Sequence, residues 1–111
     1  MALERDKEMS RLLREERLEE FNRRAASAPP DLENADLRMV DLRRADLRKA
    51  NLRGAYLRDV DLRGVDLSDA ELDGASIHGA KISGAWFPRN LPAEEITLSF
   101  VHGTRVRVRP D

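Results

Sequence analysis

A five-residue repeat occupies the centre of this 111-residue chain. A large apolar residue recurs at every fifth position from Leu32 to Phe87, and from Leu37 onward a small apolar residue stands two positions before each. A fixed short period of this kind is typical of a repeat architecture. The sequence therefore predicts a core built from Leu37, Leu42, Leu47, Leu52, Leu57, Leu62, Leu67, Leu72, Ile77, Ile82 and Phe87.

A period of five excludes the simple secondary structures. On an α-helix, five residues advance about 140° beyond a full turn, so the large residues would spiral around every face. In a straight strand, an odd period would place successive large residues on opposite sides. A chain that turns a corner once per repeat, always in the same sense, brings both the large and the small residue inward. The repeat therefore predicts an all-β solenoid with a narrow interior.

The repeat units resemble those of a known family. Residues 35–38, 45–48, 50–53 and 65–68 match the A(D/N)LXX unit of the pentapeptide-repeat family. The resemblance implies a short right-handed quadrilateral β-helix with about four pentapeptides per coil, and so about three coils. Lys81, Trp86 and Phe87 depart from the pattern, which indicates that the last coil adapts to a cap.

The chain divides into three parts. Residues 1–28 are charge-rich, contain no glycine or proline, and predict an N-terminal α-helix that forms a helical arm. Pro29 and Pro30 end that helix and open the repeat domain, which covers residues 29–87. Residues 88–111 are expected to form a small C-terminal helix/strand cap. Caps are expected because the ends of a stacked coil expose unpaired backbone groups.

The C-terminal part leaves one alternative open. Pro92 and the acidic pair after Ala93 favour a helix start, and Gly103 favours a helix stop. The alternation over residues 96–100 fits a strand equally well, so helix and strand both remain open for residues 93–102. Residues 104–109 alternate valine with arginine and predict a short strand beside the last coil.

The composition limits which cell compartments and which kinds of chemical site we expect for this chain. The chain has no cysteine, so it has neither a disulfide framework nor a thiolate metal site. Its apolar runs are far shorter than the roughly 20 residues that span a bilayer, and its charged N-terminus does not match a secretory signal. We therefore expect a cytoplasmic protein with no membrane partner. We also expect no enzyme, cofactor or metal, because His78 and His102 have no catalytic or metal-binding motif around them.

The charge pattern also argues against binding to nucleic acid. The chain has 20 basic and 21 acidic residues, so no excess of positive charge attracts a polyanion. Arginines spaced by five follow the coil around its sides, and acidic residues stand among them. We expect these groups to form ladders of weak ion pairs on the surface.

A protein–protein interaction or scaffold module fits these features best. Tyr56 replaces the usual Asp or Asn of its repeat, and Arg38 and Arg58 are expected on the same side of the coil. The N-terminal helix is expected to lie partly on the end of the solenoid. Its second patch, formed by Met9, Leu12 and Leu13, then either stays exposed or contacts a partner or a second copy of this chain. Partner contacts are therefore predicted at Arg38, Tyr56, Arg58, Met9, Leu12 and Leu13.

Two further possibilities stay open. One is a homodimer through the N-terminal helix or a solenoid end. The other, implied by the family, is a DNA mimic that binds a type II topoisomerase and protects gyrase. Residues 31–87 hold eleven acidic and nine basic residues, a net charge of −2, and about three coils span only about 14 Å. Both the charge and the length are small for a mimic of duplex DNA.

Overall fold

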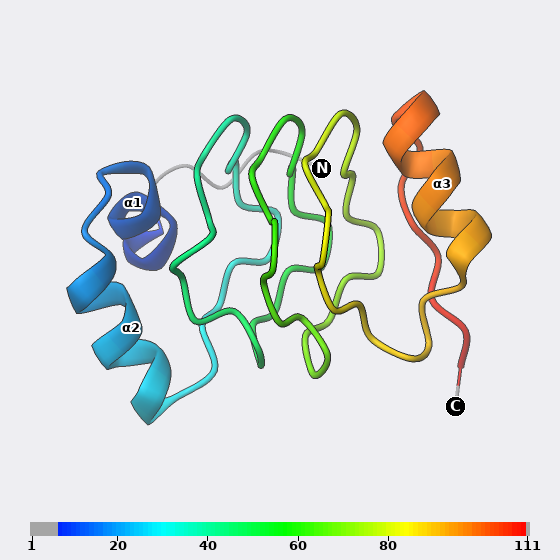
Figure 1. The fold of residues 1–111 in the computed structure, drawn as a ribbon. Coiled ribbons are helices and arrows are strands. Elements are labelled where there is room, and N and C mark those ends of the chain that lie inside the picture. Colours follow the sequence, from blue (N-terminus) through cyan, green and yellow to red (C-terminus); the bar gives the residue numbers. More distant parts are fainter. Residues whose placement is uncertain (1–6, 111) are drawn as a thin grey trace.

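The helices lie at the two ends of the molecule, with the repeat between them (Figure 1). The computed structural model describes residues 7–110. In chain order the elements are α1 (Glu8–Arg14), α2 (Leu18–Ser27), the repeat region and α3 (Ala93–His102). Residues 1–6 of the predicted arm and residue 111 of the predicted cap lie outside the described residues. Together the described parts measure 34 × 25 × 25 Å.

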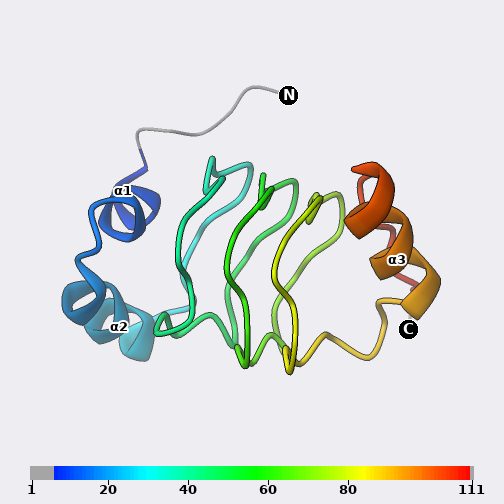
Figure 2. The same cartoon turned by 45° about the horizontal axis from the view of Figure 1, so that its top comes forward.

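The repeat region winds into stacked levels that are joined by backbone hydrogen bonds (Figure 2). Parallel bridges connect residues whose numbers differ by twenty, as in Asp31–Asn51 and Asn51–Glu71. The Leu52 N–H donates to the Glu71 carbonyl at 2.8 Å, and the Asn51 N–H donates to the Pro30 carbonyl at 2.9 Å. Because the chain turns after every few residues, the repeat forms isolated bridges rather than extended strands.

Each corner of the repeat region is a tight turn around the two positions between the large residue and the next small residue. The N–H of the small residue donates to the carbonyl of the leucine three positions earlier, as Ala55 does to Leu52 at 3.0 Å. At many corners the residue before the small one has a positive φ, as at Asn34 (58°) and Gly54 (67°). This is the third residue of a type II turn, which favours glycine or asparagine. The glycines of the repeat all occupy this position and have a positive φ.

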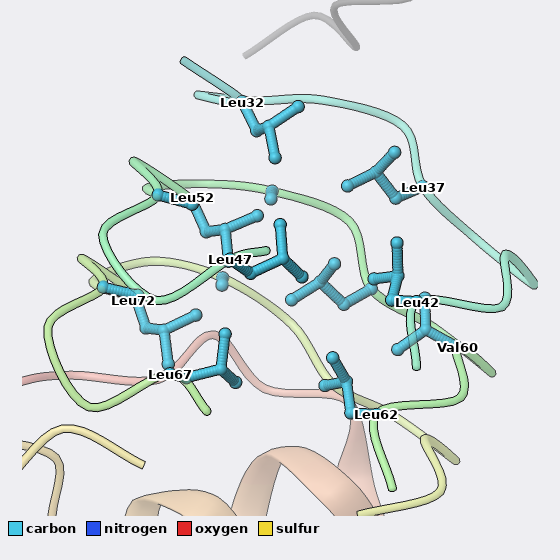
Figure 3. Close-up of a cluster of buried hydrophobic side chains, with 14 of the residues drawn as sticks. Leu32, Leu37, Leu42, Leu47, Leu52, Val60, Leu62, Leu67 and Leu72 are labelled. Carbon is cyan, nitrogen blue, oxygen red and sulfur yellow. The ribbon is translucent and has the colours of Figure 1, made fainter. Parts of the chain in front are cut away.

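The leucines of the repeat fill the interior (Figure 3). The predicted core residues from Leu37 to Ile77 are at most 2 % exposed, and most of the alanines that accompany them are also buried. The last two predicted core residues, Ile82 and Phe87, are only partly buried. They belong to the last level, where no further repeat stacks on them.

The Asp or Asn before each leucine supports the corner that follows. In the Asp61 repeat, Oδ1 accepts the Arg63 backbone N–H at 3.2 Å. The Arg63 side chain returns to the same carboxylate, with Nε 2.9 Å from Oδ1 and Nη2 2.7 Å from Oδ2. These hydrogen bonds lower the pKa of Asp61 to about 2. Ion pairs of the expected kind are thus present both within one repeat and between levels, as from Arg43 Nε to Asp61 Oδ2 at 3.3 Å.

The prediction of a single N-terminal helix is wrong, because the arm is a pair of short helices. α1 ends at Arg14 and α2 begins at Leu18, and Glu16 between them has a φ of 59°. The apolar residues of the arm do not share one stripe along a continuous helix. The break lets Leu12 and Leu13 of α1 and Phe21 of α2 join the same buried cluster as the repeat leucines.

The arm also satisfies backbone groups of the first level. The Asn22 side-chain amide donates from Nδ2 to the Arg44 carbonyl at 2.9 Å, and its Oδ1 accepts the Asp46 N–H at 2.8 Å. The Lys7 Nζ donates to the Glu33 carbonyl at 3.3 Å. The arm therefore caps its own coil, as a stacked fold requires.

At the other end, residues 93–102 are helical and cap the last level. Ser99 is fully buried, and its Oγ accepts the Ile77 N–H at 2.9 Å. The Gly79 N–H donates to the Phe100 carbonyl at 3.1 Å. Gly103 ends α3 in the left-handed conformation. Within residues 7–110, no helix is both long enough and apolar enough to cross a bilayer.

The predicted strand at residues 104–109 does not form. The segment does lie against the last level: the Val106 N–H donates to the Ala75 carbonyl, and the Gly74 N–H donates to the Val106 carbonyl, each at 2.8 Å. Val106 is therefore the residue of this segment that exchanges backbone hydrogen bonds with the repeat. Arg107 then anchors the segment to α3 through Glu95, with Nη2 2.8 Å from Oε2.

Candidate binding face

One side of the coil gathers the residues that the sequence singled out on the repeat. Parallel bridges stack Tyr56 between Asp36 and Ser76 at three successive levels. At the corner that follows, the N–H of Met39 donates to the carbonyl of Arg58 at 2.9 Å. The corners that carry Arg38 and Arg58 therefore lie on adjacent levels. Arg38, Tyr56 and Arg58 consequently lie on the same side, as predicted, and they line one hollow.

We call this hollow the basic pocket. It has a volume of about 420 Å³. The repeat forms its floor, and the end of α3 and the following segment form one wall. It is lined by Arg38, Tyr56, Arg58, Ser76, His78, His102, Gly103 and Arg105.

Arg105 is the principal residue of the pocket that the sequence did not indicate. Its guanidinium carbon lies 4.8 Å from the centre of the Tyr56 ring, a cation–π arrangement. Its Nη1 donates to the carbonyl oxygens of Gly74 at 2.6 Å and Gly54 at 3.4 Å. The alternation of valine and arginine in residues 104–109 marked the segment, but not which arginine would meet Tyr56.

Three guanidinium groups and no carboxylate line the pocket. Arg38 is held by Asp36, with Nε 2.8 Å from Oδ1 and Nη2 3.0 Å from Oδ2, and these hydrogen bonds raise the pKa of Arg38. Arg58 Nε lies 3.5 Å from Asp59 Oδ2. Within residues 7–110, Arg105 makes no ion pair with any carboxylate. Positive charge therefore exceeds negative charge around the pocket.

The two histidines occupy different positions in the pocket. His78 is partly buried, and its Nδ1 is a buried atom with no hydrogen-bond partner in the described structure. Gly103 packs against the ring, since a Cβ at Gly103 would lie in van der Waals contact with it, 3.6 Å from Nδ1. His102 is exposed at the last residue of α3.

A second hollow adjoins the first. We call it the Met39 hollow; it has a volume of about 450 Å³ and is lined by Arg14, Asp36, Arg38, Met39, Arg58 and Asp59. Met39 is 79 % exposed and has a φ of 68°, an uncommon combination for a large apolar residue. Arg38 and Arg58 line both hollows, so the two form one continuous face.

The predicted contacts on the arm are corrected by their burial. Leu12 is 2 % exposed and Leu13 is 1 % exposed, and Met9 packs partly buried against the same cluster. These side chains cover the first level of the coil and are not presented to a partner. The sequence did not reveal this, because the break between α1 and α2 determines which way they point.

The alternating acidic residues Asp69 and Asp73 contact other groups of the chain. Asp69 Oδ2 lies 3.2 Å from Arg48 Nε, and Asp73 Oδ1 accepts the Val108 N–H at 3.2 Å. Over residues 7–110, no group of three or more histidine or acidic side chains is arranged to hold a metal ion.

Comparison with known proteins agrees with the repeat pattern. A family model described as pentapeptide repeats matches residues 31–64 and 50–87, in eight copies. Neither a curated protein nor a solved structure matches the chain.

Proposed function

The chain belongs to the pentapeptide-repeat family, and from that premise we propose that it is a non-catalytic protein–protein interaction module. Its binding surface is the face formed by the basic pocket and the Met39 hollow. The partner is a protein, and neither nucleic acid nor a membrane is required.

The composition of this face is the observation that carries the proposal. Tyrosine, methionine and arginine are the residue types enriched in protein interfaces, and lysine and glutamate are depleted there. The face combines Tyr56, Met39, Arg38, Arg58 and Arg105, and it contains neither lysine nor glutamate. Its residues of other depleted types are Asp36, Asp59 and Ser76. The concave shape gives a partner side chain a site in which it loses contact with water.

The scaffold beneath the face supports the same function. Every level of the repeat is tied to its neighbours by backbone hydrogen bonds, and helices cover both ends. A rigid surface of this kind loses little conformational entropy when a partner binds. We infer that the coil is the right-handed quadrilateral β-helix of the family. The twenty-residue spacing of the bridges supports four pentapeptides per coil.

The DNA-mimic alternative has less support. A mimic of duplex DNA needs a long, strongly acidic surface, whereas this molecule measures 34 Å in its longest dimension and three arginines line its basic pocket. Gyrase supercoiling in the presence of the protein is expected to be unchanged.

Retention of a partner from host lysate tests the proposal. We expect the Tyr56→Ala, Arg58→Ala double variant to lose a protein band that the unaltered chain retains, with an unchanged circular dichroism spectrum. The matched control is Lys49→Ala, Arg89→Ala, which also removes two exposed side chains but leaves the face intact. Equal retention by both double variants would overturn the assignment of this face.

A further inference from the structure

We propose that the basic pocket binds an acidic side chain, glutamate or aspartate, of the partner protein, while the Met39 hollow receives an apolar residue of the same segment. This inference rests on the proposed function and names the chemistry of the partner. The shared walls of the two hollows, Arg38 and Arg58, place both contacts within one short segment.

The unbalanced charge of the pocket is the first argument. Its nearest carboxylates, Asp36 and Asp59, lie outside the pocket lining and pair with Arg38 and Arg58. Arg105 has no such counter-charge within the described residues. A carboxylate that enters the pocket therefore meets an arginine whose charge the protein has not neutralised.

The geometry of Arg105 is the second argument. Its Nη1 is fixed by the carbonyls of Gly74 and Gly54, and its plane lies over the Tyr56 ring. Nε and Nη2 have no acceptor among residues 7–110. This pair of donors matches the two oxygens of a carboxylate, and an arginine already held in place loses less freedom when it binds one.

The buried Nδ1 of His78 is the third argument. Buried polar atoms in folded proteins almost always have a hydrogen-bond partner. Among residues 7–110, this is the one buried side-chain nitrogen or oxygen that lacks one. His78 lines the basic pocket, so this unsatisfied atom lies beside the space that we assign to the partner's acidic side chain.

The surroundings favour a peptide over a polyanion. Asp36 and Asp59 flank the pocket on the side of the Met39 hollow and would repel a second phosphate or carboxylate there. Met39, 79 % exposed in that hollow, favours an apolar neighbour instead. One negative charge beside one apolar side chain satisfies both hollows, whereas a nucleic acid backbone does not.

The test is a nuclear magnetic resonance titration of the full chain with two blocked peptides. One repeats Glu-Gly-Leu-Gly and the other Gln-Gly-Leu-Gly, each acetylated and amidated so that only side chains carry charge. We expect the glutamate peptide to shift the amide signals of Tyr56, His78 and Gly103 in a saturable way. We expect the glutamine peptide to bind at least about tenfold more weakly, the scale of one lost charged contact.

Single variants place the contact. Arg58→Gln is expected to weaken the glutamate peptide about tenfold, and it removes an exposed side chain without leaving a buried charge. Arg105→Gln gives a second test, to be read only when its spectrum shows an intact fold. The matched control Arg89→Gln removes the same charge outside the pocket and is expected to leave the affinity within about twofold.

Three results would overturn the inference: equal binding of both peptides, equal weakening by Arg58→Gln and Arg89→Gln, or equal shifts with inorganic phosphate at the same concentration. The first two indicate no carboxylate site, and the third indicates a general anion site. If lysate retention still depends on Tyr56 and Arg58 in any of these cases, the interaction module stands and only the acidic partner is wrong.

Discussion

Where a repeat has Asp or Asn before its large residue, that side chain stabilises the corner that follows. The side chain accepts the N–H two residues later, as Asn51 does from Arg53 at 3.1 Å and Asp66 from Ser68 at 2.9 Å. An Asx turn of this kind presets the corner. A tyrosine side chain cannot accept this N–H. The Tyr56 repeat therefore lacks this hydrogen bond and presents an aromatic ring instead.

At the residue scale, two glycines give a matched prediction. Gly54 and Gly64 both have a positive φ, of 67° and 73°, so alanine at either costs about 1–2 kcal/mol of backbone strain. A Cβ at Gly54 would also overlap the Asn34 side chain, whereas nothing lies within 4 Å of one at Gly64. We expect Gly54→Ala to lower the free energy of unfolding by about 1–3 kcal/mol more than Gly64→Ala does, measured by urea unfolding. Equal losses would contradict the packing of Asn34 against Gly54.

Asp61 gives a second residue-scale prediction, on pH. Its hydrogen bonds with Arg63 lower its pKa from 3.8 to about 2 in the folded chain. Its contribution to stability is therefore complete above the unfolded pKa and is lost as the pH falls through that of the folded state. The stability difference between the native chain and Asp61→Asn should be constant near neutral pH and should shrink between about pH 4 and pH 2. Thermal unfolding across this range measures it, and a difference that does not change with pH would contradict the ion pair.

At the scale of elements, sequence patterns placed the helices better than their breaks. The sequence left helix and strand open for residues 93–102, and the structure shows the helix that the acidic first turn and Gly103 indicated. The break at residues 15–17 was not foreseen, because no proline or glycine marks it. Only the need to bury Leu13 and Phe21 on the same end of the coil explains it.

The contact of α3 with the last level gives an element-scale prediction. Ser99 Oγ accepts the buried Ile77 N–H, and no other acceptor within residues 7–110 takes that group. Ser99→Ala should therefore lower the free energy of unfolding by about 1–3 kcal/mol, the cost of an unsatisfied buried donor. Thr97→Ala, an exposed position of the same helix, should change it by less than about 0.5 kcal/mol. Similar small effects of both, by chemical unfolding, would show that α3 does not close the coil in this way.

At the scale of the whole molecule, most of the correct predictions from the sequence came from the repeat. A five-residue period determines which residues enter the core and which share a side, so the sequence alone correctly grouped Arg38, Tyr56 and Arg58. Contributions from outside the repeat, such as Arg105, His102 and the burial of Leu12, depend on how the caps fold back. No local pattern encodes that geometry.

The central claim is that this one face binds a protein, and site-specific photo-crosslinking in cells tests it most directly. Benzoylphenylalanine in place of exposed His102, at the edge of the basic pocket, should form an adduct with a defined protein. The same probe in place of exposed Lys49, outside both hollows of the face, should not. An adduct from position 102 that disappears with Arg58→Gln is the result we predict. Adducts from position 49 alone, or equally from both positions, would contradict the account.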